Sequence, residues 1–277
     1  MTTLASPTWL VGCGEMAGAM VAGWRSAGVD LSGAVAIRPS GRPVPGVRTV
    51  ASIAEAGPSP RFVILGVKPQ SLEDIAPELA QRLGPMAVVV SILAGVEAAS
   101  LRARFFNVGA IVRAMPNLPV AIRRGVVGLY SSDIDAATRD QLSQLFGLLG
   151  FAAWTGDETQ LAAIGSVAGA GPAYTARFVT ALARAAVERG LDPALAATIA
   201  LETVLGTAWL AAATGETMDM LARRVASPDG TTEAGLGVLD RDSVLDQLMA
   251  VTIAAAARRG AELAVAARPL AVETSLA

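Results

Sequence analysis

Thr8-Trp9-Leu10-Val11-Gly12-Cys13-Gly14-Glu15-Met16-Ala17 is the stretch that decides the fold of this chain. Its apolar first part predicts a strand over Trp9–Gly12, and the residues after it predict the start of a helix. In the pattern G-x-G-x-x-A, the first glycine permits a tight turn, the second lets the backbone approach a pyrophosphate, and the small alanine allows close helix–strand packing. A helix start also offers free N–H groups and a positive dipole end to phosphates. We therefore predict a dinucleotide site, and the alternative is an ordinary tight turn. The residues of this segment predicted to contact the dinucleotide are Gly12, Gly14, Glu15, Met16 and Ala17.

The loop after the second predicted strand bears on which dinucleotide binds. It reads Ile37-Arg38-Pro39-Ser40-Gly41-Arg42, with two arginines, a serine and no acidic residue. An acid at this place would bind the ribose hydroxyls of NAD, whereas arginine suits the 2′-phosphate of NADP through forked, charge-assisted hydrogen bonds. We predict NADPH, with NADH as the alternative donor, bound through Arg38 and Ser40, with Arg42 a weaker candidate. A solvated basic loop would give the same pattern.

The segment Gly66-Val67-Lys68-Pro69-Gln70 follows the third predicted strand. It lies where α/β sheets bind ligands, at the carboxyl edge of the strands. Lys68 is the one lysine among 22 basic residues, so a compact ammonium in place of arginine indicates a special role there, unless it was kept by chance. We predict that Val67, Lys68 and Pro69 contact the cofactor.

The first part of the chain alternates strand-like and helix-like segments. Several of its strand candidates are continuous apolar runs, as expected for a parallel sheet covered by helices on both faces. This order predicts a doubly wound, mostly parallel α/β sheet over residues 1–157. The expected strands are Trp9–Gly12, Ala34–Arg38, Phe62–Val67, Ala87–Leu93, Ala110–Met115 and Val126–Tyr130, and the expected helices lie near 15–27, 71–83, 97–105 and 135–149.

The remaining residues, 158–277, predict an all-helical domain. Alanine- and leucine-rich segments are separated there by Gly and Pro, for example at Gly190 and Pro193. The segment 194–213 is a nearly unbroken apolar stretch of about the minimum length that spans a membrane, but it is rich in alanine and carries Glu202 near its middle. We therefore interpret it as a helix buried between subunits, with a membrane helix as the alternative.

Composition excludes several classes of function. A formal net charge of −2 gives no basic footprint for nucleic acid. The chain has no histidine and one cysteine, Cys13, which excludes histidine-dependent catalytic triads and predicts no metal site. With one cysteine, and an N-terminus that does not resemble a signal peptide, we expect a cytoplasmic protein. The chemistry must come from hydroxyls, amides, arginines, carboxylates or a cofactor.

Taken together, these features resemble the pyrroline-5-carboxylate reductase family over nearly the whole chain. The stretch Ser227–Leu236, Ser-Pro-Asp-Gly-Thr-Thr-Glu-Ala-Gly-Leu, is the most specific match. The other matching motifs are the glycine turn Gly12–Ala17, Val67-Lys68-Pro69-Gln70, Ser91-Ile92-Leu93-Ala94-Gly95, Arg113-Ala114-Met115-Pro116-Asn117 and Gly171-Pro172-Ala173-Tyr174.

The resemblance implies a Rossmann-like domain followed by a helical domain that pairs with a second subunit into an obligate homodimer, from which larger rings can assemble. It also implies NAD(P)H-dependent reduction of a cyclic imine, Δ1-pyrroline-5-carboxylate, to L-proline in proline biosynthesis. Hydrophobic residues make up 53% of the chain, and the interface of such a dimer would bury many of them, so a membrane is not needed to explain this high share.

The resemblance also implies site residues. Ser227 and the Thr231 amide would hold the substrate carboxylate, and Thr232, the catalytic candidate, would hydrogen-bond the imine nitrogen, either donating a proton or orienting it. Met115, Pro116 and Asn117 would lie beside the nicotinamide, with Asn117 facing cofactor or substrate. Val225 and Gly230 complete the expected substrate contacts, and Ala94 and Gly95 the expected cofactor contacts. Without the resemblance, a capped helix start and a turn residue beside proline would explain Thr232 and Asn117.

Three positions depart from the family pattern and leave the imine substrate open. Leu118 replaces a threonine, Ala170 replaces a residue with a hydroxyl, and Asp229 replaces a glycine in the carboxylate-binding turn. A carboxylate at Asp229 would repel an anionic substrate unless it points outward or caps the next helix. A relative that reduces another imine is therefore one alternative.

Two further alternatives belong to other classes. A β-hydroxyacid dehydrogenase shares the two-domain plan, but it would need a lysine on the helix that begins near residue 158, which this chain lacks. A regulatory dimer that senses NADPH without catalysis would carry the same nucleotide motifs.

Overall fold

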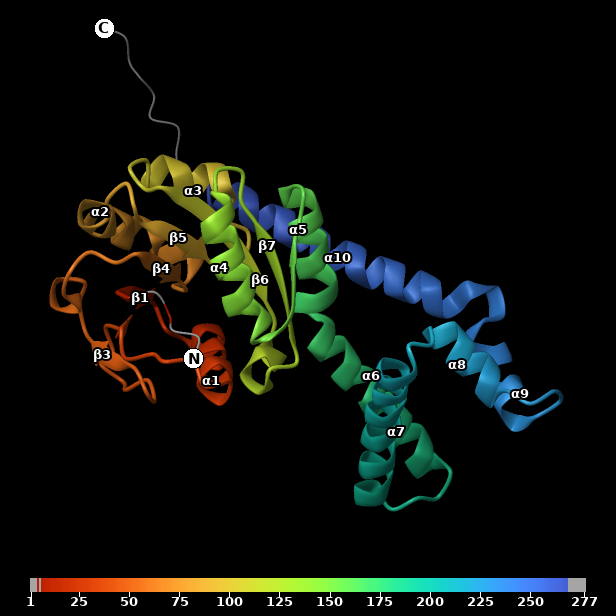
Figure 1. Ribbon diagram of the computed structural model, residues 1–277. Helices are drawn as coiled ribbons and strands as arrows, with labels where there is room; N and C mark the ends of the chain where they lie inside the picture. The colour runs from red at the N-terminus through yellow and green to blue at the C-terminus, as the bar shows by residue number, and fades with distance from the viewer. Residues whose placement is uncertain (1–3, 5, 269–277) are drawn as a thin grey trace, which may run out of the picture. The chain divides into compact units, whose positions relative to one another are not determined.

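The computed structural model describes residue 4 and residues 6–268. Within these residues, eight strands form one sheet. Their order is β3-β2-β1-β4-β5-β6-β7-β8 (Figure 1). Neighbouring strands are parallel except β6 and β7, which are antiparallel. The strands are β1 (Thr8–Val11), β2 (Ala34–Ile37), β3 (Arg48–Val50), β4 (Phe62–Leu65), β5 (Val88–Ser91), β6 (Ala110–Pro116), β7 (Gly125–Tyr130) and β8 (Gly150–Trp154).

The mostly parallel sheet predicted from the sequence is confirmed, and all six predicted strands are present. Two further strands, β3 and β8, were not predicted. The three residues of β3 include an exposed arginine, Arg48, and β8 is an edge strand with the exposed Phe151, so neither carries the buried apolar run that marks the others.

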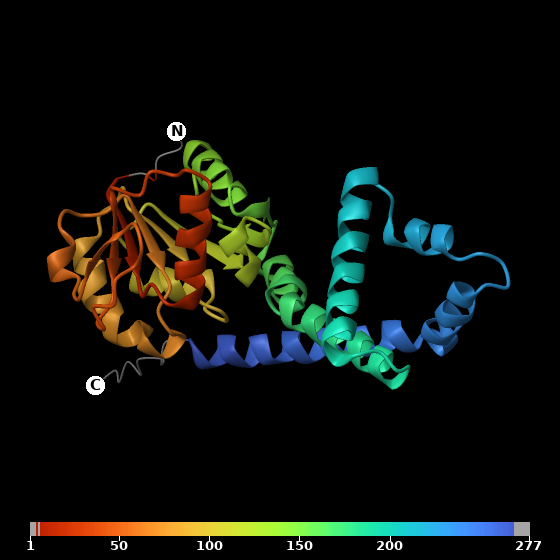
Figure 2. The same cartoon turned by 90° about the horizontal axis from the view of Figure 1, so that it is seen from below.

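Helices cover both faces of the sheet, because alternate residues of the central strands are buried on opposite sides. Trp9 and Val11 belong to one apolar core and Leu10 to the other. α1 and α4 pack on the Leu10 face, where the Trp24 indole N–H donates to the Leu145 carbonyl at 2.9 Å, and α2 and α3 pack on the opposite face (Figure 2). These four helices, all predicted, are α1 (Glu15–Ser26), α2 (Leu72–Arg82), α3 (Ala98–Arg104) and α4 (Ala136–Gly147).

The register of the parallel strands brings their carboxyl ends to one edge of the sheet. Val11, at the end of β1, lies opposite Ile37 of β2 on one side and Leu65 of β4 on the other. From β1, the sheet continues through β2 to β3 on one side and through β4 to β5 on the other, so the strand order reverses at β1. This is the position at which open α/β sheets form a ligand-binding crevice.

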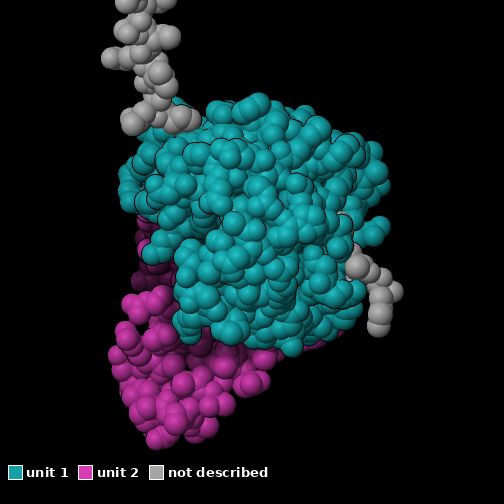
Figure 3. Space-filling model, turned by 90° about the vertical axis from the view of Figure 1, so that its left-hand side faces the viewer, with its two compact units in different colours: residues 1–170, 256–277 teal, residues 171–255 magenta. Residues whose placement is uncertain are grey.

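The described chain divides into two compact units, coloured separately in Figure 3. The first contains residues 1–170 and 256–277, and the second contains residues 171–255. The first therefore extends past the predicted domain boundary at residues 157 and 158, which stays a prediction. Helix α5 (Glu158–Ile164) and a π-helical turn, η4 (Gly165–Gly169), end the sheet-containing part of the first unit. The short 3-10 turns are η1 (Ala54–Ala56), η2 (Pro69–Ser71), η3 (Leu118–Ile122) and η5 (Arg241–Ser243).

All-helical structure is confirmed for residues 158–268, the part of this region that the structure describes. Among these helices, α6 and α7 pack on each other. Pro193–Thr214, which is α7, is long and apolar enough to cross a membrane by length and composition, and little of it is buried within one chain. The helices are α6 (Gly171–Glu188), α7 (Pro193–Thr214), α8 (Met218–Val225), α9 (Thr231–Leu239) and α10 (Val244–Ala266).

Candidate cofactor and substrate sites

A cavity of about 460 Å³ opens at the carboxyl edge of the sheet in the first unit. Its volume lies within the range of small-molecule and cofactor sites. It is lined by Gly12, Cys13, Gly14, Ile37, Arg38, Pro39, Ser40, Ala51, Ser52, Ile53, Gly66, Val67, Lys68, Ser71, Ile75 and Glu78. Six predicted cofactor contacts, Gly12, Gly14, Arg38, Ser40, Val67 and Lys68, therefore line one cavity.

Glycine is required at the two positions of the first turn for different physical reasons. Gly12 has a φ of +79°, and a Cβ atom there would lie 2.6 Å from the Val67 backbone nitrogen, so no side chain fits. Gly14 is the residue before α1, and a Cβ atom there would meet nothing within 4 Å. Its open side leaves the backbone free for close approach by a ligand, as a pyrophosphate site requires.

Close packing explains the small residue at Ala17, and the cofactor contact predicted for Ala17 stays a prediction. A Cβ atom on Gly66 would lie 3.5 Å from the Ala17 methyl group, which shows how closely α1 approaches the end of β4. Ala17 is buried and does not line the cavity. Glu15, Met16 and Pro69 are also absent from the cavity lining, so their predicted contacts stay predictions.

Arg38 and Ser40 lie on the loop that leaves β2 and both line the cavity. The Arg38 guanidinium donates to the Arg42 carbonyl at 3.3 Å, and the Arg42 amide donates to the Ser40 hydroxyl at 3.4 Å. These bonds curl the loop and hold Arg38 beside the glycine turn. Its nearness is evident at Cys13, where burial raises the thiol pKa and the positive charge of Arg38 lowers it in part. Arg42 itself is exposed and does not line the cavity.

Several cavity residues were missed by the sequence analysis. Ala51, Ser52 and Ile53 follow β3, whose strand signal is too short to place them at this edge. Ile75 and Glu78 lie one turn apart on α2 and point to the same side. Their helical spacing of three was visible in the sequence, but nothing in the sequence indicated which face of α2 borders the site.

Asn117 has a structural role that the sequence did not predict. Its side-chain oxygen accepts a hydrogen bond from the Val126 amide at 2.8 Å, and its side-chain nitrogen donates to the Ala168 carbonyl at 3.0 Å. The buried side chain thus ties the end of β6 to the start of β7 and to the π-helical turn η4. One amide hydrogen remains for a ligand, so the cofactor or substrate contact predicted for Asn117 stays a prediction.

The remaining cofactor candidates lie outside the 460 Å³ cavity. Met115 and Pro116 end β6, and a Cβ atom on Gly165 would lie 3.3 Å from the Met115 Cε. Ala94 and Gly95 form the turn between β5 and α3, and Gly95 has a φ of +77°. In a parallel sheet both segments lie at the carboxyl edge, on the β5–β6 side of the cavity.

In the second unit, the predicted substrate residues gather at the start of α9. The Gly230 amide donates to the Ser227 carbonyl at 2.9 Å, which closes a turn before the helix. Thr231 and Thr232 are the first residues of the helix. Gly230, which precedes them, has no side chain, and no side-chain hydrogen bond caps this helix start. These amides and hydroxyls can bind a carboxylate. Val225 is exposed at the end of α8.

Comparison with known proteins covers both halves of the chain. A family model described as "Pyrroline-5-carboxylate reductase dimerisation" matches residues 158–263. The pyrroline-5-carboxylate reductase of Pseudomonas aeruginosa is 36% identical over 261 residues, which are 92% of this chain and 95% of the relative. The chain belongs to the pyrroline-5-carboxylate reductase family. The enzyme of Pisum sativum is also similar, with 33% identity over 90% of this chain and 93% of the relative.

Solved structures of pyrroline-5-carboxylate reductases have the same fold. The structure from Coxiella burnetii has a TM-score of 0.85 at 29% identity, covering 94% of this chain and 99% of that chain. The Plasmodium falciparum structure, with NADP bound, has a TM-score of 0.83 at 21% identity, covering 94% and 98%. The predicted Rossmann-like domain with a C-terminal dimerisation domain is therefore confirmed.

The departures from the pyrroline-5-carboxylate reductase pattern lie in different surroundings. Leu118 is half exposed at the start of η3, and Ala170 is half-buried just after the π-helical turn. Asp229 is exposed and has a left-handed backbone, with a φ of 58°, which glycine adopts more readily. The Asp229 amide donates to the Glu233 carboxylate at 2.7 Å, so Glu233 rather than Asp229 holds this turn.

Proposed function

We propose that this protein is a pyrroline-5-carboxylate reductase, which reduces Δ1-pyrroline-5-carboxylate to L-proline with NADPH. The observation that carries the proposal is the similarity of 92% of the chain to the enzyme of Pseudomonas aeruginosa, with 36% identical residues. The reaction adds a hydride to the imine carbon and a proton to the imine nitrogen. A bound nicotinamide nucleotide supplies the hydride, so the protein needs neither histidine nor metal for that step.

The glycine turn and the loop after β2 would bind the nucleotide. The open side of Gly14 and the free amides at the start of α1 suit the pyrophosphate. Arg38, which lines the cavity with Ser40, suits the 2′-phosphate of NADP. Glu78 also lines the cavity, and its carboxylate would repel a phosphate placed next to it, so we place the phosphate on the Arg38 side.

The start of α9 would bind the substrate carboxylate. The Thr231 and Thr232 amides and the Ser227 hydroxyl present donors around the start of the helix. The Thr232 hydroxyl would hydrogen-bond the imine nitrogen and either deliver the proton or hold an already protonated imine in place. Holding the imine fixed lowers the entropic part of the barrier, which is the main contribution we assign to these residues.

A homodimer is the proposed assembly, and it is the unit from which larger rings would form. α7 has exposed Leu201, Leu205 and Trp209 within one chain, which is expected when a second subunit covers the helix. The dimerisation model matches the residues of this helix. A membrane position for α7 is the competing explanation, and a cytoplasmic location stays our proposal; cell fractionation and light scattering of the purified protein test both.

Turnover of Δ1-pyrroline-5-carboxylate with NADPH, followed as loss of reduced-nicotinamide absorbance, tests the function. Thr232→Ala should lower kcat while the Kd for NADPH stays the same, and Thr159→Ala, at an exposed position of α5, is the matched control. A protein that turns over other imines but not this one would refute the proposed substrate. A protein that binds NADPH but reduces no imine in a panel would instead support an NADPH sensor.

Arg38→Ala tests the choice of nucleotide. Loss of a charge-assisted bond worth about 1.5–3 kcal/mol should raise KM for NADPH roughly 10- to 150-fold and leave KM for NADH nearly unchanged. Arg42→Ala, in the same loop but outside the cavity lining, should have a much smaller effect. An equal loss with both nucleotides would contradict a 2′-phosphate contact at Arg38.

A further inference from the structure

The C-terminal end of α10 packs tightly on the turn between β5 and α3. Both segments belong to the first compact unit. At Gly95, a Cβ atom would lie 2.8 Å from the Leu263 Cβ and 3.1 Å from the Ala264 backbone nitrogen. Any side chain at Gly95 would therefore push the helix away, so the turn and α10 are in direct backbone contact.

Polar contacts fasten the same helix end to α3. The Ser100 hydroxyl, which belongs to a buried residue, donates to the Ala267 carbonyl at 3.1 Å. The Arg104 guanidinium donates to the Ser100 carbonyl at 2.7 Å and to the Ala267 carbonyl at 3.4 Å. Because the last carbonyls of a helix have no partner within it, these donors satisfy one of them and fix where α10 ends.

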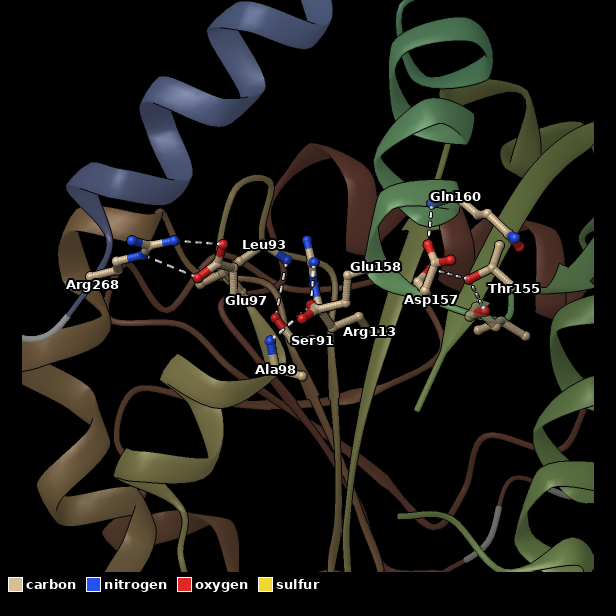
Figure 4. Close-up of polar contacts among 11 residues, drawn as sticks. Ser91, Leu93, Glu97, Ala98, Arg113, Thr155, Asp157, Glu158, Gln160 and Arg268 are labelled. Atoms are coloured by element: carbon tan, nitrogen blue, oxygen red, sulfur yellow. Dashed lines mark hydrogen bonds and ion pairs between the residues drawn. The ribbon is translucent and has the colours of Figure 1, made fainter. Parts of the chain in front are cut away.

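An ion pair adds a third contact, between Arg268 and Glu97 (Figure 4). Two Arg268 nitrogens each lie 3.2 Å from a different carboxylate oxygen of Glu97, the residue that precedes α3. This paired geometry raises the pKa of Arg268. The pair is partly exposed, so its contribution to stability is modest, but it orients the residue two positions after Gly95.

From the other side, the turn is held by Glu158, the first residue of α5. One Glu158 oxygen accepts the Ala98 amide at 2.9 Å and pairs with the Arg113 guanidinium at 2.5 Å (Figure 4). Glu158 thus caps α3 while anchored to buried Arg113 of β6. The turn that contains Ala94 and Gly95 is fixed between this anchor and the end of α10.

We propose that residues 263–268, the end of α10 and the two residues after it, position the Ala94–Gly95 turn for binding of the nicotinamide nucleotide. The proposal rests on the proposed function, in which this turn contacts the cofactor. Leu263, Ala267 and Arg268 act through the turn and touch no reacting atom. Their loss gives the turn more freedom before the nucleotide binds, so the affinity for NADPH falls while the chemical step keeps its rate once the cofactor is bound.

Charge reversal at the ion pair tests this role. Glu97→Arg and Arg268→Glu should each raise the Kd for NADPH up to about fivefold, the most that an exposed pair is expected to give. Both should leave kcat at saturating NADPH within about twofold of the wild type. The double variant restores the opposite charges and should restore the Kd. Arg259→Glu is the matched control, since Arg259 lies exposed on the same helix and pairs with Glu262 rather than with a residue of the turn.

Ser100→Ala is a second, uncharged perturbation, which removes the donor to the Ala267 carbonyl and should also raise the Kd. Melting temperatures establish that each variant is folded. Folded variants with wild-type Kd, or a double variant no better than the single ones, would overturn the positioning role alone. Wild-type protein that binds no nicotinamide nucleotide would overturn the proposed function and this inference together.

Discussion

Substituting alanine for each glycine of the first turn should separate folding from nucleotide binding. Gly12→Ala places a Cβ 2.6 Å from the Val67 nitrogen and 2.5 Å from the Val67 Cγ1, at a φ of +79°. A left-handed alanine costs about 1–2 kcal/mol, and forcing an atom into packed surroundings costs about 1–3 kcal/mol more. We expect a loss of about 2–5 kcal/mol, which at roughly 2–4 °C per kcal/mol is a clear drop in melting temperature.

Gly14→Ala should have the opposite profile. Its backbone is extended, with a φ of −80°, and the new methyl group meets nothing within 4 Å. Alanine is a poorer residue than glycine before a helix, but it also reduces the entropy of the unfolded chain, so the net change should be within about 1 kcal/mol. The methyl group would occupy the side from which the pyrophosphate approaches, so the Kd for NADPH should rise more than about tenfold, or 1.4 kcal/mol.

Thermal melting and titration with NADPH, carried out on both variants, provide the assay. The reasoning predicts that Gly12→Ala melts early and that Gly14→Ala melts normally but binds poorly. Gly28→Ala is the control, because Gly28 has a similar φ of +76° with no atom near its missing Cβ, so it reports the cost of the backbone conformation alone. A Gly14→Ala protein that binds NADPH like the wild type would refute our placement of the pyrophosphate.

Three further changes test other parts of the structure. Glu158→Ala should destabilise the first unit by about 3–5 kcal/mol, measured by denaturant unfolding, because it leaves buried Arg113 without its partner, whereas an unchanged midpoint would contradict that role. Asp229→Gly should raise the melting temperature slightly, by relief of about 1 kcal/mol of left-handed strain, and lower the KM for Δ1-pyrroline-5-carboxylate by removing a like charge, and a higher KM would show that the carboxylate helps binding. Asp135 accepts hydrogen bonds from the side chain and backbone of Thr138, which lower its pKa, so the stability it contributes is present above about pH 3.9 and is lost as pH falls through the lowered pKa. Asp135→Asn should flatten that acid limb of a stability–pH profile, and an identical profile would show that another group causes it.

Most of the sheet could be predicted because its central strands are continuous apolar runs. β1, β4 and β5 are buried on both faces, and that burial is visible in their sequence. β3 and β8 could not be predicted, since one is very short and the other is a partly exposed edge strand. Their pairing depends on neighbours that are already in place.

The candidate site was predictable where local backbone geometry dictates residue type. Gly12 and Arg38 follow strands β1 and β2, and the parallel order of those strands brings them to one cavity. Glu78 was missed because only the packing of α2 on the sheet decides which of its faces borders that cavity. For Asn117, the sequence shows a polar residue after a strand, but not that its carboxamide is committed to Val126 and Ala168.

By itself, the sequence determined the class of fold, the glycine turn, the arginine loop without an acid, and the family. The first three follow from short-range rules, namely apolar periodicity, the space that a turn allows and the charge that a phosphate requires, whereas the family follows from the resemblance of the motifs. The tertiary structure decided what lies beside what, including Gly95 against Leu263 and Glu158 between α3 and Arg113. Such contacts join residues 45 to 168 positions apart, and they exist only once the helices have packed on the sheet, because no local pattern specifies which distant atoms will fill the space next to a given residue.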